Sequence, residues 1–278
     1  MRVGCHVSAA GGVLKMLERA GERGASVAQC FLGSPRSWRW SVGVAPEPDV
    51  VREAAQRAGV ERIVVHASYL INLASVDAKL RDRSLALLRQ TAIAAEGIGA
   101  ESVVVHAGSA PGDDPDAARQ RIREGLERVL EATSTIRILV ENPATGSVAS
   151  GPAELGALAG ALRTKRVGVC LDTQHLFAVG WAIDEAAGRE EIVTALQAAQ
   201  VPVALWHCND SASERGRGRD RHANIGEGAI GAEALCSLVA DRRLPEADVV
   251  LEVPGAGDGP RAEDVAAVRA LLVRHERL

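Results

Sequence analysis

Short apolar runs alternate with amphipathic segments along almost the whole chain. The runs, such as IVVHA, VVVHA, ILVEN and VALWH, are apolar at successive positions, which is typical of strands in a parallel sheet that is covered on both faces. We expect eight strands, ending near His6, Phe31, His66, His106, Glu141, Asp172, His207 and Glu252. A helical segment is expected after each strand, and two of these segments show core-facing stripes, at Ile122, Leu126, Val129 and Leu130 and at Val265, Val268 and Leu272.

Eight βα units predict an α/β fold of the (β/α)8 TIM-barrel type, with the active site at the C-terminal ends of the strands. A doubly wound sheet is the alternative. No Pro-, Ser- or charge-rich linker divides the chain, and 278 residues is close to the usual length of such a barrel. Residues 1–278 are therefore predicted to form a single catalytic domain. Two long loops, 34–49 and 208–230, follow the second and seventh strands, where ligands bind in either fold.

The amino-acid composition limits which kinds of catalysis and binding are expected. A chain that is 47% hydrophobic and 24% charged can bury a large core, which excludes disorder. Three of its 32 basic residues are lysines, so lysine-based catalysis is not expected, whereas guanidinium contacts are plentiful. The net charge of -4 argues against a general nucleic-acid coat but not against a local basic site.

The cysteine pattern and the start of the chain indicate the compartment. The five cysteines include no C-x-x-C pair, which favours reduced thiols and a cytoplasmic protein. The N-terminus lacks the apolar stretch of a signal peptide, and no stretch reads as a membrane span.

Histidines gather where the strands are predicted to end. Six of the seven lie at or just beyond a strand end, and His275 alone lies in a predicted helix. In a barrel these ends converge, so His66, His106 and His207 should approach one another. The carboxylates of the same level are Glu141, Asp172 and Glu252. Three imidazoles and three carboxylates suit zinc, with manganese as second choice.

Each of these residues also has an ordinary interpretation. A single strand-end histidine is more often a hydrogen-bonded polar residue than a ligand, and a carboxylate after a strand is commonly a helix N-cap. The joint pattern favours metal, because packing so many ionisable groups together without a cation would be costly.

Two close pairs extend the candidate site. Asp172 and His175 lie where a strand turns into a loop, so they can face different ions. Asp220 and His222 are two residues apart, so on extended backbone both face one side while Arg221 points away. We expect His175 to complete the site of this second pair. Spacing alone, however, favours a mobile, solvated charge run for the loop RGRGRDRH.

With these residues assembled, the sequence resembles the endonuclease IV family of apurinic/apyrimidinic (AP) endonucleases. The resemblance covers almost the whole chain and follows the family's motif order. Its motifs are GCHVSAAGG, HASYLINLAS, VVVHAGS, LVENPATG, CLDTQHLFAVG, HCNDS, DRHANIGEG and LEVPG. It implies a zinc-dependent enzyme that hydrolyses the phosphodiester 5′ to an abasic site in duplex DNA, leaving a 3′-OH, in base excision repair. Blocked 3′ ends are a further implied substrate, and a monomer is expected.

Carried over by motif, the resemblance implies three zinc ions per chain. His66, His106 and Glu141 would hold one ion, and Glu141 would bridge to a second one held also by Asp172, His207 and Glu252. His175, Asp220 and His222 would hold the third, and manganese is the alternative metal at one site. Glu141 and Glu252 are the implied catalytic residues. Arg36, Tyr69 and Leu70 are the residues implied to contact DNA at the lesion.

The chain departs from the family at three positions that are not ligands. The family commonly has the motifs H-A-P-Y, E-N-T-A-G and D-T-C-H. In place of the Pro, the Thr and the Cys of these motifs, the chain has Ser68, Pro143 and Gln174. Two rival functions remain: a divalent-metal sugar isomerase or epimerase on the same barrel, and a zinc-stabilised binding module. The isomerase interpretation is weakened because no lysine lies in a strand-end motif, and the binding module because structural zinc sites are usually Cys-rich.

Overall fold

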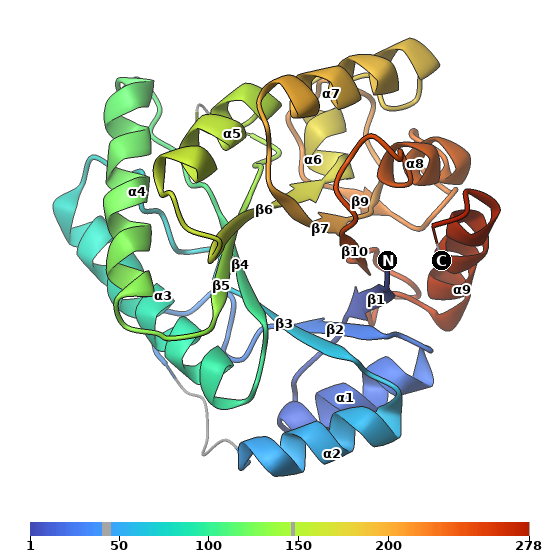
Figure 1. Ribbon diagram of the computed structural model, residues 1–278, viewed down its shortest axis with the longest axis horizontal. Coiled ribbons are helices and arrows are strands. Elements are labelled where there is room, and N and C mark those ends of the chain that lie inside the picture. Colours follow the sequence, from blue (N-terminus) through green and yellow to red (C-terminus); the bar gives the residue numbers. More distant parts are fainter. Residues whose placement is uncertain (41–45, 146–147, 278) are drawn as a thin grey trace.

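The predicted barrel is confirmed. The computed structural model describes residues 1–40, 46–145 and 148–277. Eight parallel strands close in the order β1-β10-β7-β6-β5-β4-β3-β2, inside a ring of helices (Figure 1). The barrel strands are β1 (Val3–His6), β2 (Val27–Cys30), β3 (Arg62–His66), β4 (Ser102–His106), β5 (Arg137–Glu141), β6 (Val167–Asp172), β7 (Val203–His207) and β10 (Asp248–Leu251). Every strand ends within one residue of its predicted end.

The helices follow the strands as the amphipathic pattern predicts. They are α1 (Val13–Glu22), α2 (Pro48–Ala58), α3 (Ala78–Gly97), α4 (Pro115–Leu130), α5 (Pro152–Ala161), α6 (Thr173–Ala178), α7 (Ala186–Ala198), α8 (Ala232–Val239) and α9 (Ala262–Arg274). In α4 the stripe residues Ile122, Leu126 and Val129 are buried against the barrel. None of the helices in the described ranges is both long and apolar enough to cross a membrane.

The connection after β7 differs from the prediction. The segment expected to be a loop contains two short strands, β8 (Asp210–Ser211) and β9 (His222–Ala223), which pair antiparallel. Two-residue strands are too short to show a hydrophobic period, so the sequence pattern could not reveal them. The other long loop, 34–49, includes residues 41–45, which lie outside the described residues.

A layer of small apolar side chains fills the inside of the barrel. It takes one residue from each of seven strands: Val27, Val64, Val104, Leu139, Cys170, Leu205 and Val250. At the matching position β1 has Gly4, where a Cβ would lie 1.7 Å from the carbonyl oxygen of Val27. The polar C-terminal ends of the strands lie directly above this apolar layer.

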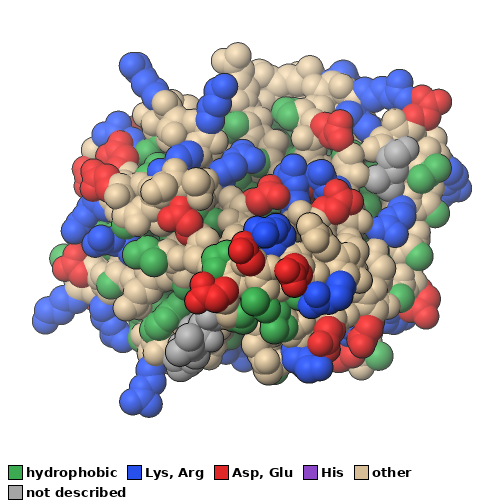
Figure 2. Space-filling model, turned by 60° about the horizontal axis from the view of Figure 1, so that its bottom comes forward, with side chains coloured by type: hydrophobic (Ala, Val, Ile, Leu, Met, Phe, Trp, Pro, Cys, Tyr) green, Lys and Arg blue, Asp and Glu red, His purple; other side chains and the backbone are tan. Residues whose placement is uncertain are grey.

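Both signs of charge are mixed on one face of the molecule. Figure 2 shows acidic and basic side chains interspersed on one face. That face therefore offers no broad single-sign field to attract a polyanion.

One acidic side chain fastens α3 to the start of β5 and makes stability depend on pH. Oε1 of Glu96 accepts hydrogen bonds from the backbone N–H groups of Ser134, Thr135 and Ile136 and from the Thr135 hydroxyl. These bonds, led by that from the Thr135 N–H, lower the pKa of Glu96 to about 2. A lowered folded-state pKa contributes stability that is present above the unfolded-state pKa and lost as pH falls toward the folded value.

We therefore expect Glu96→Gln to lower the free energy of unfolding by about 1 kcal/mol at pH 7. The difference from wild type should shrink as the pH falls from 5 to 3. Urea unfolding at a series of pH values measures this, with the exposed Glu263→Gln as the control. A deficit independent of pH would show that the ionised carboxylate is not what matters.

Candidate active site

Eight polar side chains ring the C-terminal end of the barrel, one from each strand. Each lies two residues after the inward-facing position of the apolar layer, so strand alternation turns it to the same interior side. The ring consists of His6, Gln29, His66, His106, Glu141, Asp172, His207 and Glu252. Most of these residues line or underlie a cavity of about 520 Å³ that also receives Arg36, Tyr69, His175, Asp220, Arg221 and His222.

Three groups of possible metal ligands adjoin one another in this ring. Within each group the donor atoms lie within 4.8 Å of one another. The groups are His66, His106 and Glu141; Glu141, Asp172, His207 and Glu252; and Asp172, His175 and His222. Asp220 reaches the last group from the loop, with Oδ1 3.5 Å from His175 Nε2 and 3.3 Å from His222 Nε2. The structure thus brings together the nine candidate ligands and places Asp172 between two groups.

Backbone carbonyls orient three of the histidines. Nδ1 of His66 lies 2.7 Å from the carbonyl oxygen of Ala67. Nδ1 of His175 lies 2.9 Å from that of Asn142, and Nδ1 of His222 lies 3.2 Å from that of Glu252. A carbonyl oxygen only accepts hydrogen bonds, so each Nδ1 donates and each Nε2 faces the carboxylates.

The inward-facing nitrogens fit a cation. His66 Nε2 lies 3.1 Å from Oε2 of Glu141, and His106 Nε2 lies 3.4 Å from the same oxygen. Nε2 of His175 and of His222 are buried, with no hydrogen-bond partner among the described residues. Buried nitrogens that face carboxylates need a proton or a metal ion between them. The mixed nitrogen and oxygen donor set suits a divalent metal such as zinc.

The shifted pKa values of three side chains in the site also indicate that positive charge is favoured there. Burial lowers the pKa of His175, but Asp172, Asp220 and Glu141 outweigh burial and raise it to about 10. Burial raises the pKa of Glu252, yet the neighbouring imidazoles, His207 first, bring it well below its usual value. Burial lowers the pKa of His106 to about 4, so this ring is neutral near pH 7 and ready to bind a metal.

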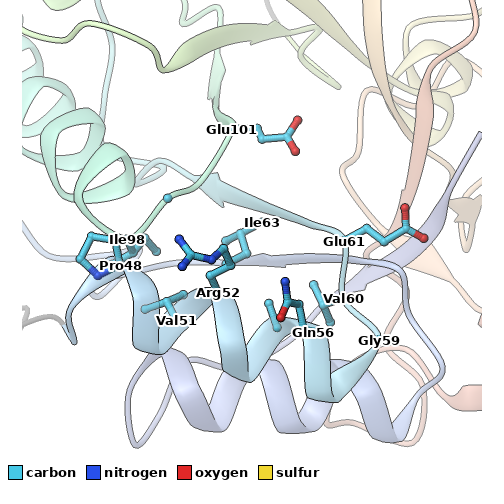
Figure 3. A pocket seen from close by; sticks show the side chains of 12 residues that line it. Pro48, Val51, Arg52, Gln56, Gly59, Val60, Glu61, Ile63, Ile98 and Glu101 are labelled. Atoms are coloured by element: carbon cyan, nitrogen blue, oxygen red, sulfur yellow. The ribbon is translucent and has the colours of Figure 1, made fainter.

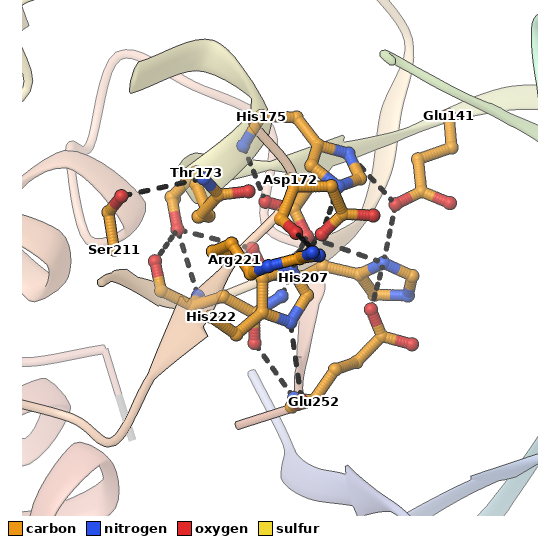
Figure 4. Close-up of polar contacts among 12 residues, drawn as sticks. Glu141, Asp172, Thr173, His175, His207, Ser211, Arg221, His222 and Glu252 are labelled. Carbon is orange, nitrogen blue, oxygen red and sulfur yellow. Dashed lines mark hydrogen bonds and ion pairs between the residues drawn. The ribbon is translucent and has the colours of Figure 1, made fainter. Parts of the chain in front are cut away.

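The loop that carries Asp220 is docked rather than free. Gln174 Nε2 donates to the Arg219 carbonyl at 2.7 Å, and the N–H groups of Gly216 and Gly218 donate to Phe177 and Ala178 of α6 at 3.0 and 2.9 Å. The expectation of a mobile charge run is therefore wrong. Figure 4 shows the polar contacts of the neighbouring candidate ligands, with Asp172, His175 and His222 among the labelled residues.

One detail corrects the sequence interpretation of this region, and a second explains its glycines. Arg221 lines the cavity together with Asp220 and His222 and does not simply point away. The glycine-rich segment GEGAIG wraps around the buried carboxylate of Asp210, which accepts hydrogen bonds from the N–H groups of Gly226, Gly228, Ile230 and Gly231. The close approach of these backbone N–H groups to the Asp210 carboxylate accounts for the glycines.

The candidate DNA-contacting residues lie at the mouth of the cavity. Arg36 and Tyr69 line it, and the half-exposed Tyr69 ring lies 5.6 Å from the ring of His66. Leu70 is half-buried and is not a lining residue. Ser68, one of the departures from the family, donates its hydroxyl to the Pro35 carbonyl at 2.8 Å. Proline could not form that bond, which ties the loop of Tyr69 to the loop of Arg36.

A second groove is larger but has no comparable chemistry. It encloses about 660 Å³ beside α2, with Val51, Ile63 and Ile98 on its walls and Arg52 and Gln56 near its mouth (Figure 3). No histidine lines it, and its carboxylates, Glu61 and Glu101, lie at its rim. A choice based on cavity volume alone would have selected this groove instead of the cavity at the C-terminal ends of the strands.

Known proteins with similar sequences place the chain in a family. The sequence profile described as the xylose isomerase-like TIM barrel matches residues 17–274. A protein of Mycobacterium tuberculosis named "Probable endonuclease 4" is 37% identical over 274 residues, which cover 97% of this chain and 98% of the relative. The chain belongs to the endonuclease IV family. It is thus an enzyme of the endonuclease IV type.

Solved structures agree with this assignment. The crystal structure of endonuclease IV from Thermus thermophilus superimposes with a TM-score of 0.84 at 34% identity, covering 99% of this chain and 100% of that one. A D-tagatose 3-epimerase-like protein matches with a TM-score of 0.71 at 20% identity, covering 99% and 97% of the two chains. The second likeness shows the shared fold alone.

Sequence reasoning missed two members of the ring and one contact of the loop. His6 was noted at a strand end without a role, whereas Gln29 and Gln174 carry no obvious chemistry in the sequence. Gln29 contacts two candidate ligands, and Gln174 fastens the loop beside a third. The spacing of two residues after each apolar layer position could have revealed Gln29.

Proposed function

We propose that this endonuclease IV family member is a zinc-dependent AP endonuclease. It hydrolyses the phosphodiester on the 5′ side of an abasic site in duplex DNA and leaves a 3′-OH, as a base excision repair enzyme. Duplexes with blocked 3′ ends are its second substrate class. The nine ligand candidates would hold three zinc ions, with manganese the second choice at one site. We place the protein in the cytoplasm as a monomer with a single catalytic domain, 1–278.

One observation carries the proposal: three adjoining groups of nitrogen and oxygen donors share one cavity with two guanidinium groups that pair with no carboxylate of the described residues. Arg36 and Arg221 line this cavity, and neither forms an ion pair with a carboxylate among the described residues. A neutral sugar would make little use of two free arginines at the mouth. A phosphodiester supplies the anion that they match.

The chain's own residues would act around the scissile phosphate. Bound divalent ions would supply Lewis-acid polarisation of the phosphate and stabilise the leaving oxygen. Glu141 lies in two ligand groups, so it would tie them together. Glu252 stays ionised and can accept a hydrogen bond from the attacking water, which orients that water. Arg36 and Tyr69 would occupy the space that a missing base leaves open.

The decisive experiment offers the purified protein two substrates. We expect cleavage of a duplex that contains one abasic site, with a 3′-OH product, and no change in ketose or aldose sugars. Metal analysis should find about three zinc ions per chain. Epimerisation of a sugar without DNA cleavage would replace the proposal by the rival function, and absence of metal would reject both.

Recognition of the lesion can be tested apart from catalysis. The double variant Arg36→Ala with Tyr69→Ala should bind an abasic duplex about thirtyfold more weakly, or about 2 kcal/mol, because side chains that fill an unstacked step contribute on that scale. Its zinc content should match wild type, since neither residue is a ligand candidate. Binding is measured at one fixed salt concentration, with Arg57→Ala on α2 as control. Equal affinity of wild type and double variant would rule out the two residues as lesion contacts.

A further inference from the structure

Gln29 lies in the polar ring although it is no metal ligand candidate. It is fully buried on β2, beside His6 of β1 in the sheet register. Its Oε1 lies 2.9 Å from Nε2 of His207, and its Nε2 lies 2.7 Å from Oε1 of Glu252 and 3.0 Å from Nδ1 of His6. One uncharged side chain thus contacts two members of the same ligand group.

The contacts determine which way the amide faces. The ionised carboxylate of Glu252 only accepts hydrogen bonds, so the amide nitrogen must be the atom that faces it. The amide oxygen then faces His207 and needs a donor there, which requires the proton of His207 to sit on Nε2. Nδ1 of His207 then faces Oε1 of Glu141 at 2.9 Å and Oε2 of Glu252 at 3.2 Å, where a proton or a metal ion must lie between them.

We propose that Gln29 is a positioning residue that selects Nδ1 of His207 as the metal-binding atom and at the same time fixes the carboxylate of Glu252. This inference rests on the proposed metal-dependent function and adds a residue that the ligand motifs do not contain. Gln29 acts through its neighbours and touches neither the ions nor the DNA.

His207 differs here from the histidines that backbone carbonyls orient. Those carbonyls keep their places whatever the neighbouring side chains are. For His207 the described residues supply a side chain instead, so its preferred nitrogen can be changed by a single substitution. Partners of this kind typically contribute about 10- to 100-fold to metal affinity.

Two substitutions separate the two ends of the amide. Gln29→Met keeps a similar shape and removes both contacts. Gln29→Glu keeps an acceptor for His207 but turns a second carboxylate toward Glu252. The matched control is Gln56→Met, an exposed glutamine on α2 beside the separate groove. Zinc affinity is measured by competition with a chromophoric chelator, and thermal unfolding of the zinc-free proteins monitors the fold.

The imidazole nitrogens of zinc-free, ¹⁵N-labelled protein give a readout that does not depend on activity. In wild type we expect His207 to show one ring form, in which the Nε2 proton is hydrogen-bonded to Gln29 and Nδ1 faces the carboxylates. Gln29→Met should lose this single form and bind one of its ions about 10- to 100-fold more weakly. Gln29→Glu should keep the nitrogen signature and still lose affinity. The control should match wild type in both measurements.

Several outcomes would overturn the proposal. Gln29→Met with wild-type zinc affinity and an unchanged nitrogen signature would do so. If Gln29→Met does not fold, the Gln29→Glu variant tests the proposal instead. Wild-type zinc affinity in Gln29→Glu would show that the contact between Gln29 and Glu252 does not contribute to metal binding. A wild-type protein that binds no zinc would instead reject the proposed function, while the nitrogen spectra would still test the hold of Gln29 on His207.

Discussion

Glu252→Gln is expected to leave the barrel folded and to slow cleavage of an abasic duplex by about 10³-fold. The carboxylate belongs to the four-residue ligand group and receives the amide of Gln29 at 2.7 Å, and Nδ1 of His207 lies 3.2 Å away. Glutamine keeps the shape but removes the negative charge that balances the ions. Its amide oxygen can accept from Gln29 in place of Oε1, which turns the amide nitrogen toward His207 and removes an anionic donor from the ligand group.

Single-turnover cleavage with saturating enzyme measures the chemical step directly. The exposed Glu263→Gln on α9 controls for loss of a carboxylate elsewhere. Thermal unfolding shows whether the variant is folded. Turnover near that of wild type in a folded Glu252→Gln protein would remove this residue from the mechanism.

The second large effect concerns the loop group. Replacing both Asp220 and His222 by alanine should lower zinc content by about one ion and slow cleavage at least about 100-fold, because positive charge near the phosphate is lost. The loop itself should stay in place. Its hydrogen bonds to Gln174, Phe177 and Ala178 involve neither substituted side chain.

Metal analysis and trypsin digestion test the two parts of this prediction together. Arg217 and Arg219 offer cleavage sites within the loop, and they should resist trypsin as well as in wild type. The control replaces Asp116 of α4 and His275, neither of which lines the cavity, by alanine. Full zinc content together with normal cleavage in the Asp220/His222 variant would limit the centre to two ions.

The fold was largely predictable because its strands are covered on both faces. Runs such as IVVHA and ILVEN are continuous apolar stretches that end in a polar residue, so both the strand and its end are visible in the sequence. The strands β8 and β9 were missed, since two residues cannot show a period. Their place is set by tertiary contacts such as the Asp210 carboxylate with the Gly226–Gly231 segment.

The candidate site was predictable where residue type carries the chemistry. Histidine and carboxylate stand out at strand ends, so six of the eight ring residues could be proposed as ligands. Residue type does not mark Gln29, because glutamine is common on surfaces and its role depends on facing His207 and Glu252. Only its spacing from the apolar layer could have revealed it. The docking of the loop likewise depends on Gln174, which sequence comparison marks only as a departure.

The position of β10 has a consequence for how the protein is made. This strand closes the barrel between β1 and β7, and it comes last in the chain. Glu252 follows it directly, so a chain still emerging from the ribosome has neither a closed barrel nor the last carboxylate of its ligand group. The proposed metal centre can therefore be complete only after β10 has been made and has closed the barrel.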